Sequence, residues 1–387
     1  PGTLTEEALL DDRRDNLLVA IHQLDRRWGL AALDLSGARF CVQEVETGEA
    51  LLGEIQRLCP SEIIVNEAVA LPPELDQRDG LRRQPAWLFE TDSAERQLNA
   101  QFGTRDLAGF GCETLTAAVG AAGGLLQYVA NTQRTALPHI RSLSVENRTD
   151  SLVLDAATRR NLELEQSTSG NHRHTLVGVL DRTATAMGGR LLRRWVHRPL
   201  RDHAILEQRL QCVSALVGTD CHSAINETLR GCADIERILS RIALKSARPR
   251  DLSGLRDSLA LLPGLQALIA EIDDPHIHEL SRQLGIHSDV HDLLARAIRE
   301  SPPLLLRDGD VLADGYDSDL DELRKLSEHG DRFLLEMEQT ERERSGIGNL
   351  KIRYNRVHGY YIEVSRLQAD RVPDLSLIHI SEPTRLQ

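Results

Sequence analysis

Residues 16–45 read NLLVAIHQLDRRWGLAALDLSGARFCVQEV. Three β-rich runs make up this stretch, and short turn signals such as Ser36-Gly37 separate them. The runs cover 16–24, 28–35 and 38–45. Runs of this length and spacing predict three consecutive strands that pair as an antiparallel meander.

Helices and a further strand follow the meander. The spacing predicts an amphipathic helix over 49–58, a buried strand over 62–65, and helices over 94–102 and 113–134. Gly123-Gly124 lies inside the last helix and would let another element pack closely against it. A meander that passes into helices and a further strand predicts an α/β domain.

Beyond about residue 150 the pattern is helical. The predicted helices cover 155–164, 186–196, 203–217, 221–229, 233–244, 252–272 and 290–300. Asp251 is placed to act as the N-cap of the helix that follows Arg248-Pro249-Arg250. A long charged helix over 317–343, interrupted at His329-Gly330, completes a mainly α-helical second part.

Residues 350–366, LKIRYNRVHGYYIEVSR, predict a basic β-hairpin with a turn at His358-Gly359. Leu350, Ile352 and Tyr354 alternate with polar residues, so one face of the hairpin is apolar. From residue 344 to 366 there are five Lys or Arg and one acid, a local charge of +4 on a chain of net charge −13. The hairpin is either a contact for the phosphates of nucleic acid or a solvated hairpin with one buried face.

The composition limits the possible classes of protein. Hydrophobic residues make up 41% and charged residues 27% of the chain, as is usual for soluble globular proteins. No apolar run approaches the roughly 20 residues that cross a bilayer, so we expect no membrane partner. The six cysteines form no C-x-x-C pair, which fits a reducing cytoplasm.

No catalytic or cofactor motif stands out. The sequence has no Gly-Lys pair, so it has no phosphate-binding loop of the Walker type. Asp11, Asp12 and Asp15 alternate with two arginines, which favours a solvated charged turn over a metal site. We therefore predict no catalytic residues and no metal or cofactor site.

Four arginines surround Trp195 in the predicted helix 186–196 and just after it. They are Arg190, Arg193, Arg194 and Arg198. They could contact nucleic acid, or they could form salt bridges with acid-rich helices nearby. We favour the salt bridges.

Several blocks, in order along the chain, together resemble bacterial MutS, the DNA mismatch-recognition family. The blocks are QFGTRDLAGFG (101–111), LLQY (125–128), LPHI (137–140), LDAATRRNLE (154–163), DIERIL (234–239), ARPRDL (247–252) and HGYYI (358–362). The resemblance covers residues 1 to about 373 and is specific because it rests on several blocks. The last segment, 375–387, does not resemble the family; it is similar to sequencing-adapter or vector read-through.

The resemblance implies an order of domains. Residues 1–11 would be a linker from an N-terminal mismatch-binding domain, and 12–150 the connector domain, RNase H-like in fold but without nuclease activity. Residues 151–332 would form the helical core, or lever, domain. Residues 333–374 would begin the clamp, a partial β domain that grips the duplex backbone.

The resemblance also implies a function. The chain would be a fragment of a DNA mismatch repair protein that, intact, binds mismatched DNA. This part would contact the DNA backbone without sequence preference and couple the DNA-binding and ATPase ends. ATP and Mg²⁺ would belong to a C-terminal domain outside it, so the fragment would not be an enzyme.

The resemblance further implies double-stranded DNA, MutL and a second copy of the chain as partners, in the bacterial cytoplasm near the nucleoid. The DNA-binding residues that we predict all lie in or beside the hairpin. They are Lys351, Arg353, Asn355, Arg356, His358 and Arg366.

A nuclease of the RNase H type with a helical appendage is the alternative function. Such an enzyme needs carboxylates on adjacent strands to hold two cations. Asp34 is the one acid deep in a predicted strand, and the first strand offers only Ala20 and Ile21 beside it. The sequence therefore favours the repair protein.

Overall fold

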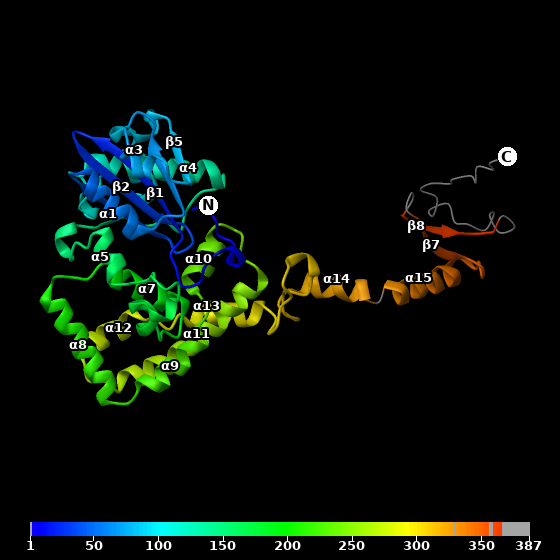
Figure 1. Ribbon diagram of the computed structural model, residues 1–387. Helices are drawn as coiled ribbons and strands as arrows, with labels where there is room; N and C mark the ends of the chain where they lie inside the picture. The colour runs from blue at the N-terminus through cyan, green and yellow to red at the C-terminus, as the bar shows by residue number, and fades with distance from the viewer. Residues whose placement is uncertain (1, 329, 356–358, 366–387) are drawn as a thin grey trace. The chain divides into compact units, whose positions relative to one another are not determined.

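The three predicted strands of the meander form the centre of a six-stranded sheet (Figure 1). The strands are β1 (Leu17–Leu24), β2 (Arg27–Asp34), β3 (Arg39–Val45), β4 (Glu62–Asn66), β5 (Leu81–Gln84) and β6 (Ser144–Val145). Their order across the sheet is β5-β4-β1-β2-β3-β6. β1, β2 and β3 pair antiparallel, whereas β4, β5 and β6 each pair parallel to a neighbour. The meander is confirmed, and its topology agrees with the RNase H-like domain expected from the resemblance.

The structure is a computed structural model that describes residues 2–328, 330–355 and 359–365. It divides into two units, Pro1–Val311 and Leu312–Gln387. The predicted tail 375–387 and part of the segment 333–374 lie outside the described residues.

Helices cover both faces of the sheet because every central strand is apolar on both sides. α1 (Gly48–Leu58) packs on the face that carries Val19 and Ile21. α3 (Thr91–Phe102) and α4 (Thr116–Gln133) pack on the face that carries Leu18 and Ala20. Successive residues along a strand point to opposite faces of the sheet. The buried apolar side chains therefore form two clusters, one on each face of the sheet. A short helix, α2 (Pro73–Asp76), precedes β5.

The close approach predicted at Gly123-Gly124 is confirmed. A Cβ on Gly123 would lie 2.2 Å from the Cβ of Ala94 in α3. Only glycine lets the two helices come this near without a shift.

The second part of the first unit is helical, as predicted. Its helices are α5 (Ala156–Asn161), α6 (Leu176–Leu180), α7 (Ala186–His197), α8 (His203–Gly218), α9 (His222–Arg230), α10 (Ile235–Ala243), α11 (Pro249–Ala270), α12 (Pro275–Gln283) and α13 (Ser288–Ala297). Short 3₁₀ helices occur at Glu7–Leu9, Ala86–Phe89, Ala108–Phe110, Arg148–Asp150, His172–His174 and Leu306–Asp308. The sequence did not predict α6 or α12. No helix in the described residues is both long and apolar enough to cross a membrane.

The prediction that Asp251 is the N-cap of α11 is wrong, because the N-cap lies three residues earlier. α11 begins at Pro249, and Arg248 is its N-cap. Asp251 lies inside the first turn, where its carboxylate accepts a hydrogen bond from the Arg248 amide at 2.8 Å. Proline suits the first helical position because it has no amide hydrogen to satisfy there, so the helix starts at Pro249.

In the part that the structure describes, the second unit has two α-helices and a hairpin. α14 (Ser318–Glu328) and α15 (Gly330–Ser345) take the place of the long charged helix, and His329 lies outside the described residues. β7 (Lys351–Asn355) and β8 (Gly359–Glu363) pair antiparallel. The fold class predicted from the sequence is confirmed: an α/β domain, a helical region and a small antiparallel sheet.

Candidate functional site

The hairpin carries aromatic and aliphatic side chains on one face. Ile352 pairs with Ile362, and Tyr354 pairs with Tyr360. Directly opposed residues of an antiparallel pair share a face. The rings of Tyr354 and Tyr360 lie 5.0 Å apart, centroid to centroid. Leu350, just before β7, is buried, whereas both tyrosines and Ile362 are exposed. Most of the apolar face of the hairpin is therefore open to solvent in the described residues.

The opposite face is polar. Lys351 pairs with Glu363 in the strand register, and Arg353 pairs with Tyr361. Arg353 also forms a diagonal ion pair, with its Nε 2.9 Å from Oε2 of Glu363. This face therefore presents two cations, a tyrosine and one carboxylate to the solvent.

α15 holds the start of the hairpin in place. Glu338 accepts a hydrogen bond from the backbone amide of Ile352 at 2.9 Å, and Arg342 donates to the carbonyl of Leu350 at 2.8 Å. Arg342 and Glu338 also form an ion pair with each other. Because a helix and a strand share these contacts, the position of Lys351 and Arg353 is fixed relative to α15.

The structure brings two of the predicted DNA-binding residues together, Lys351 and Arg353, on the polar face. Asn355 ends β7 opposite Gly359. Arg356, His358 and Arg366 lie outside the described residues.

A second polar site lies in the first unit, where the α/β domain meets the helices that follow. At its centre Arg190 of α7 is buried and binds three acceptors: Asp234, Glu236 and the backbone carbonyl of Asp12. Both Asp234 oxygens accept from Arg190 at 2.7 Å, which is a bidentate geometry. Burial acts to lower the pKa of Arg190, but the hydrogen bonds and charges of Asp234 and Glu236 outweigh it and raise that pKa. Arg190 is therefore a permanent buried cation.

Arg194, one helical turn further along α7, binds the segment that leads into β1. Its Nε and Nη2 lie 2.8 and 2.7 Å from the two carboxylate oxygens of Asp15. Arg39 at the start of β3 lies 3.8 Å from the same carboxylate. Burial would raise the pKa of Asp15, but Arg194 and Arg39 overcome that effect and lower it.

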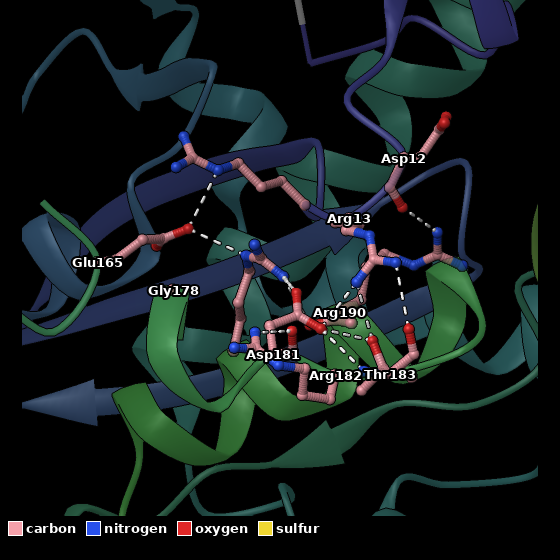
Figure 2. Close-up of polar contacts among 12 residues, drawn as sticks. Asp12, Arg13, Glu165, Gly178, Asp181, Arg182, Thr183 and Arg190 are labelled. Atoms are coloured by element: carbon pink, nitrogen blue, oxygen red, sulfur yellow. Dashed lines mark hydrogen bonds and ion pairs between the residues drawn. The ribbon is translucent and has the colours of Figure 1, made fainter. Parts of the chain in front are cut away.

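Arg13 and Arg14 extend the contact, as Figure 2 shows for Arg13. Arg13 donates to Asp181 at 2.7 Å and to the hydroxyl of Thr183 at 3.0 Å. Arg14 lies 3.0 Å from Glu165, a carboxylate that Arg193 and His197 of α7 also bind. The residues from Asp12 to Asp15 thus connect the sheet to α7, to Glu165 and to the turn that follows α6.

The structure changes the interpretation of this segment. The predicted solvated charged turn at Asp11, Asp12 and Asp15 is wrong for Asp15, whose side chain is 12% exposed. Salt bridges at Arg190, Arg193, Arg194 and Arg198 are confirmed. Their partners differ from those expected, since among them only Glu236 lies within an α-helix, Asp150 ends a 3₁₀ helix, and Asp234 caps α10. Asp15 and Glu165 lie in connecting segments.

Asp34, the one acid deep in a predicted strand, binds groups of the turn that follows it. Its side chain is buried at the end of β2, and Oδ1 accepts hydrogen bonds from the amides of Ser36 and Gly37 and from the Ser36 hydroxyl. Burial, and then the charge of Asp15, raise the pKa of Asp34. No group of three or more His, Cys, Asp or Glu that could hold a metal ion occurs in the part of the chain that the structure describes.

Two family models match the chain. The model of MutS domain III matches residues 157–370, and that of MutS domain II matches residues 16–141. The first match alone spans more than half of the 387 residues. This chain belongs to the MutS family. The hairpin falls within the domain III match, whereas the Arg194–Asp15 contact joins domain III to the residue just before the domain II match. The chain is therefore a part of a mismatch repair protein that carries these two domains.

Proposed function

We propose that the polar face of the hairpin contacts the phosphate backbone of duplex DNA. The observation that carries this proposal is the placement of Lys351 and Arg353 on one solvent-facing strand, braced by α15. Phosphate contacts position a protein on DNA but carry no sequence information. The hairpin would therefore hold duplexes of any sequence, matched or mismatched.

Local charge supports a hairpin contact despite the acidic chain. Charges further apart than a Debye length, about 8 Å at physiological ionic strength, are largely screened. The cations of the hairpin would thus act on a nearby phosphate even though the chain as a whole is acidic. Asn355, Arg356, His358 and Arg366 complete the proposed contact on sequence grounds.

We also propose that the ion-pair network couples the α/β domain to the helical part. Arg190 and Arg194 tie α7 to Asp12 and Asp15, at the entrance to the central strand β1. A buried bidentate pair resists small rotations because its geometry is specific. A movement of the helical part would then be passed to the sheet through these residues.

The remaining proposals rest on membership of the family. Residues 12–150 would be the connector, 151–332 the core or lever, and 333–374 the start of the clamp, with MutL and a second copy as protein partners. The ATP and Mg²⁺ of the intact family would be held elsewhere, since this sequence has no Gly-Lys pair and therefore no Walker-type phosphate-binding loop.

A binding titration tests the proposed DNA contact. Fluorescently labelled duplexes, one fully paired and one with a single mismatch, are titrated with the chain at several salt concentrations. We expect a Kd on the order of 10⁻⁴ to 10⁻⁶ M at physiological salt, equal for the two duplexes and weaker as salt rises. Binding that prefers the mismatch by tenfold, or that ignores salt, contradicts the proposal.

A further inference from the structure

A cavity of about 870 Å³ lies beside the ion-pair network of the first unit. Its walls come from the segment before β1, the end of α1, and helices α5 and α7. Eleven arginines line it, against four acidic residues. Such an excess of arginine is unusual on a chain of net charge −13. We therefore looked for the negative group that pairs with each arginine.

Seven of these arginines have carboxylate partners. Examples are Arg57, which binds Glu54 and Glu146, and Arg198, which lies 3.5 Å from Asp150. The other four, among the residues that the structure describes, lie within ion-pair distance of no carboxylate. They are Arg78, Arg159, Arg160 and Arg209.

Arg159 of α5 shows the imbalance most clearly. Its guanidinium donates only to neutral groups: the carbonyls of Leu154 and His197, at 3.1 and 2.9 Å, and the His197 ring. Burial, and then the positive charge of Arg57, lower the pKa of Arg159. A half-buried cation repelled by its neighbour gains most from a mobile counter-ion.

The remaining unpaired arginines point to the same chemistry. Arg160 follows Arg159 in α5 and is exposed. Arg209 stacks on Trp195 with its guanidinium carbon 3.7 Å from the ring centroid. That contact uses the flat face of the guanidinium and leaves its N–H groups at the edge free to donate.

We propose that this cavity binds a small multivalent oxyanion of the phosphate class, such as inorganic phosphate or pyrophosphate. Guanidinium forks match the oxygens of such anions in bidentate geometry. Arg159 and Arg160 would bind the anion from α5, and Arg78, before β5, and Arg209, in α8, would contribute charge from other parts of the lining. The site is separate from the hairpin and does not depend on the proposed DNA contact.

Calorimetry and thermal unfolding with inorganic pyrophosphate, at constant ionic strength, test this site. The double variant Arg159→Gln/Arg160→Gln is compared with Arg105→Gln/Arg141→Gln, which removes two exposed arginines of the α/β domain that do not line the cavity. We expect pyrophosphate to bind the parent and raise its unfolding midpoint. The cavity variant should bind about tenfold more weakly or worse and lose that rise, whereas the control keeps both.

Three outcomes overturn the proposal. One is no binding to the parent at millimolar pyrophosphate. Another is equal weakening in both double variants, which indicates bulk charge alone. The third is a cavity variant that keeps the parent's affinity for pyrophosphate, which places the binding elsewhere. If the double variant does not fold, Arg160→Gln alone, at an exposed position, gives the same comparison against Arg105→Gln.

Discussion

Arg353 and Glu363 form a diagonal ion pair across the hairpin, with 2.9 Å between Nε and Oε2. Their side chains are 56% and 54% exposed, so water and salt screen the attraction. Exposed pairs of this kind contribute about 0–1 kcal/mol to stability. Glu363 therefore holds Arg353 on the polar face but does not bind it tightly enough to exclude a phosphate.

Replacing Glu363 should strengthen DNA binding. Glu363→Gln removes the one described carboxylate on the polar face. A phosphate of DNA then does not have to displace a carboxylate from Arg353. We expect duplex affinity to rise about two- to fivefold, equally on matched and mismatched duplexes. Fluorescence anisotropy at fixed salt measures the change, and Glu95→Gln, an exposed position in α3, serves as the control. A Glu363→Gln variant that binds less tightly would indicate that the carboxylate positions Arg353 for the contact.

Arg190 should be the most sensitive position of the interdomain network. Arg190→Ala leaves Asp234 and Glu236 without their shared cation, and the carbonyl of Asp12 without its donor. Removing one partner of a buried pair typically costs about 3–5 kcal/mol, and the partial exposure of Glu236 favours the lower end. Urea unfolding measures the cost. Arg282→Ala, which breaks the exposed pair with Glu279 inside α12, should cost less than about 1 kcal/mol.

Two helical glycines should respond to alanine with opposite signs. Gly123→Ala would place a Cβ 2.2 Å from Ala94, so α3 and α4 must separate, and overpacking of this kind costs about 1–3 kcal/mol. Gly53→Ala in α1 meets nothing within 4 Å. It should stabilise the chain by about 0.5–1 kcal/mol because alanine favours the helix. Equal thermal shifts for the two variants would disprove the close packing of α3 on α4.

Glu165 should make the first unit sensitive to acid. Burial acts to raise its pKa, but the hydrogen bond from His197 and the charges of Arg14, His197 and Arg193 lower it to about 2 from an ordinary 4.5. A lowered pKa in the folded state means that the stabilisation is complete above about pH 4.5 and is lost as the pH falls towards about 2. At 1.36 kcal/mol per pKa unit, the loss is at most about 3 kcal/mol.

Urea unfolding of the parent and of Glu165→Gln between pH 5 and pH 2 checks this pH dependence. The parent should lose stability faster over that range, and the two curves should converge at the acid end. Parallel curves would show that Glu165 does not titrate differently in the folded and unfolded states.

Local patterns in the sequence predicted the core of the fold. β1 to β3 are recognisable because their apolar runs lie next to one another in the chain, and α4 because its residues show helical spacing. β5 was missed because its residues, Leu-Arg-Arg-Gln, show little apolar alternation, and it becomes a strand only by pairing with β4.

The interdomain network could not be predicted in the same way. Asp15 and Arg194 are 179 residues apart, and no local pattern links an acid beside two arginines to a helix so far along the chain. The sequence placed Asp15 with its neighbours Arg13 and Arg14, whereas the structure gives each of the three a different partner. Four arginines around Trp195 were a visible signal, but their partners required the structure.

Salt-dependent binding by a hairpin variant tests the central claim most directly. The double variant Lys351→Ala/Arg353→Ala is compared with Arg105→Ala/Arg141→Ala, which loses the same charge outside the hairpin. Each cation that neutralises a phosphate contributes about −0.9 to the slope of log K against log salt. With circular dichroism matching the parent, the hairpin variant should flatten that slope by about two units on both matched and mismatched duplexes, and the control should not. A folded hairpin variant that keeps the parent's affinity and slope would show that the DNA contact lies elsewhere.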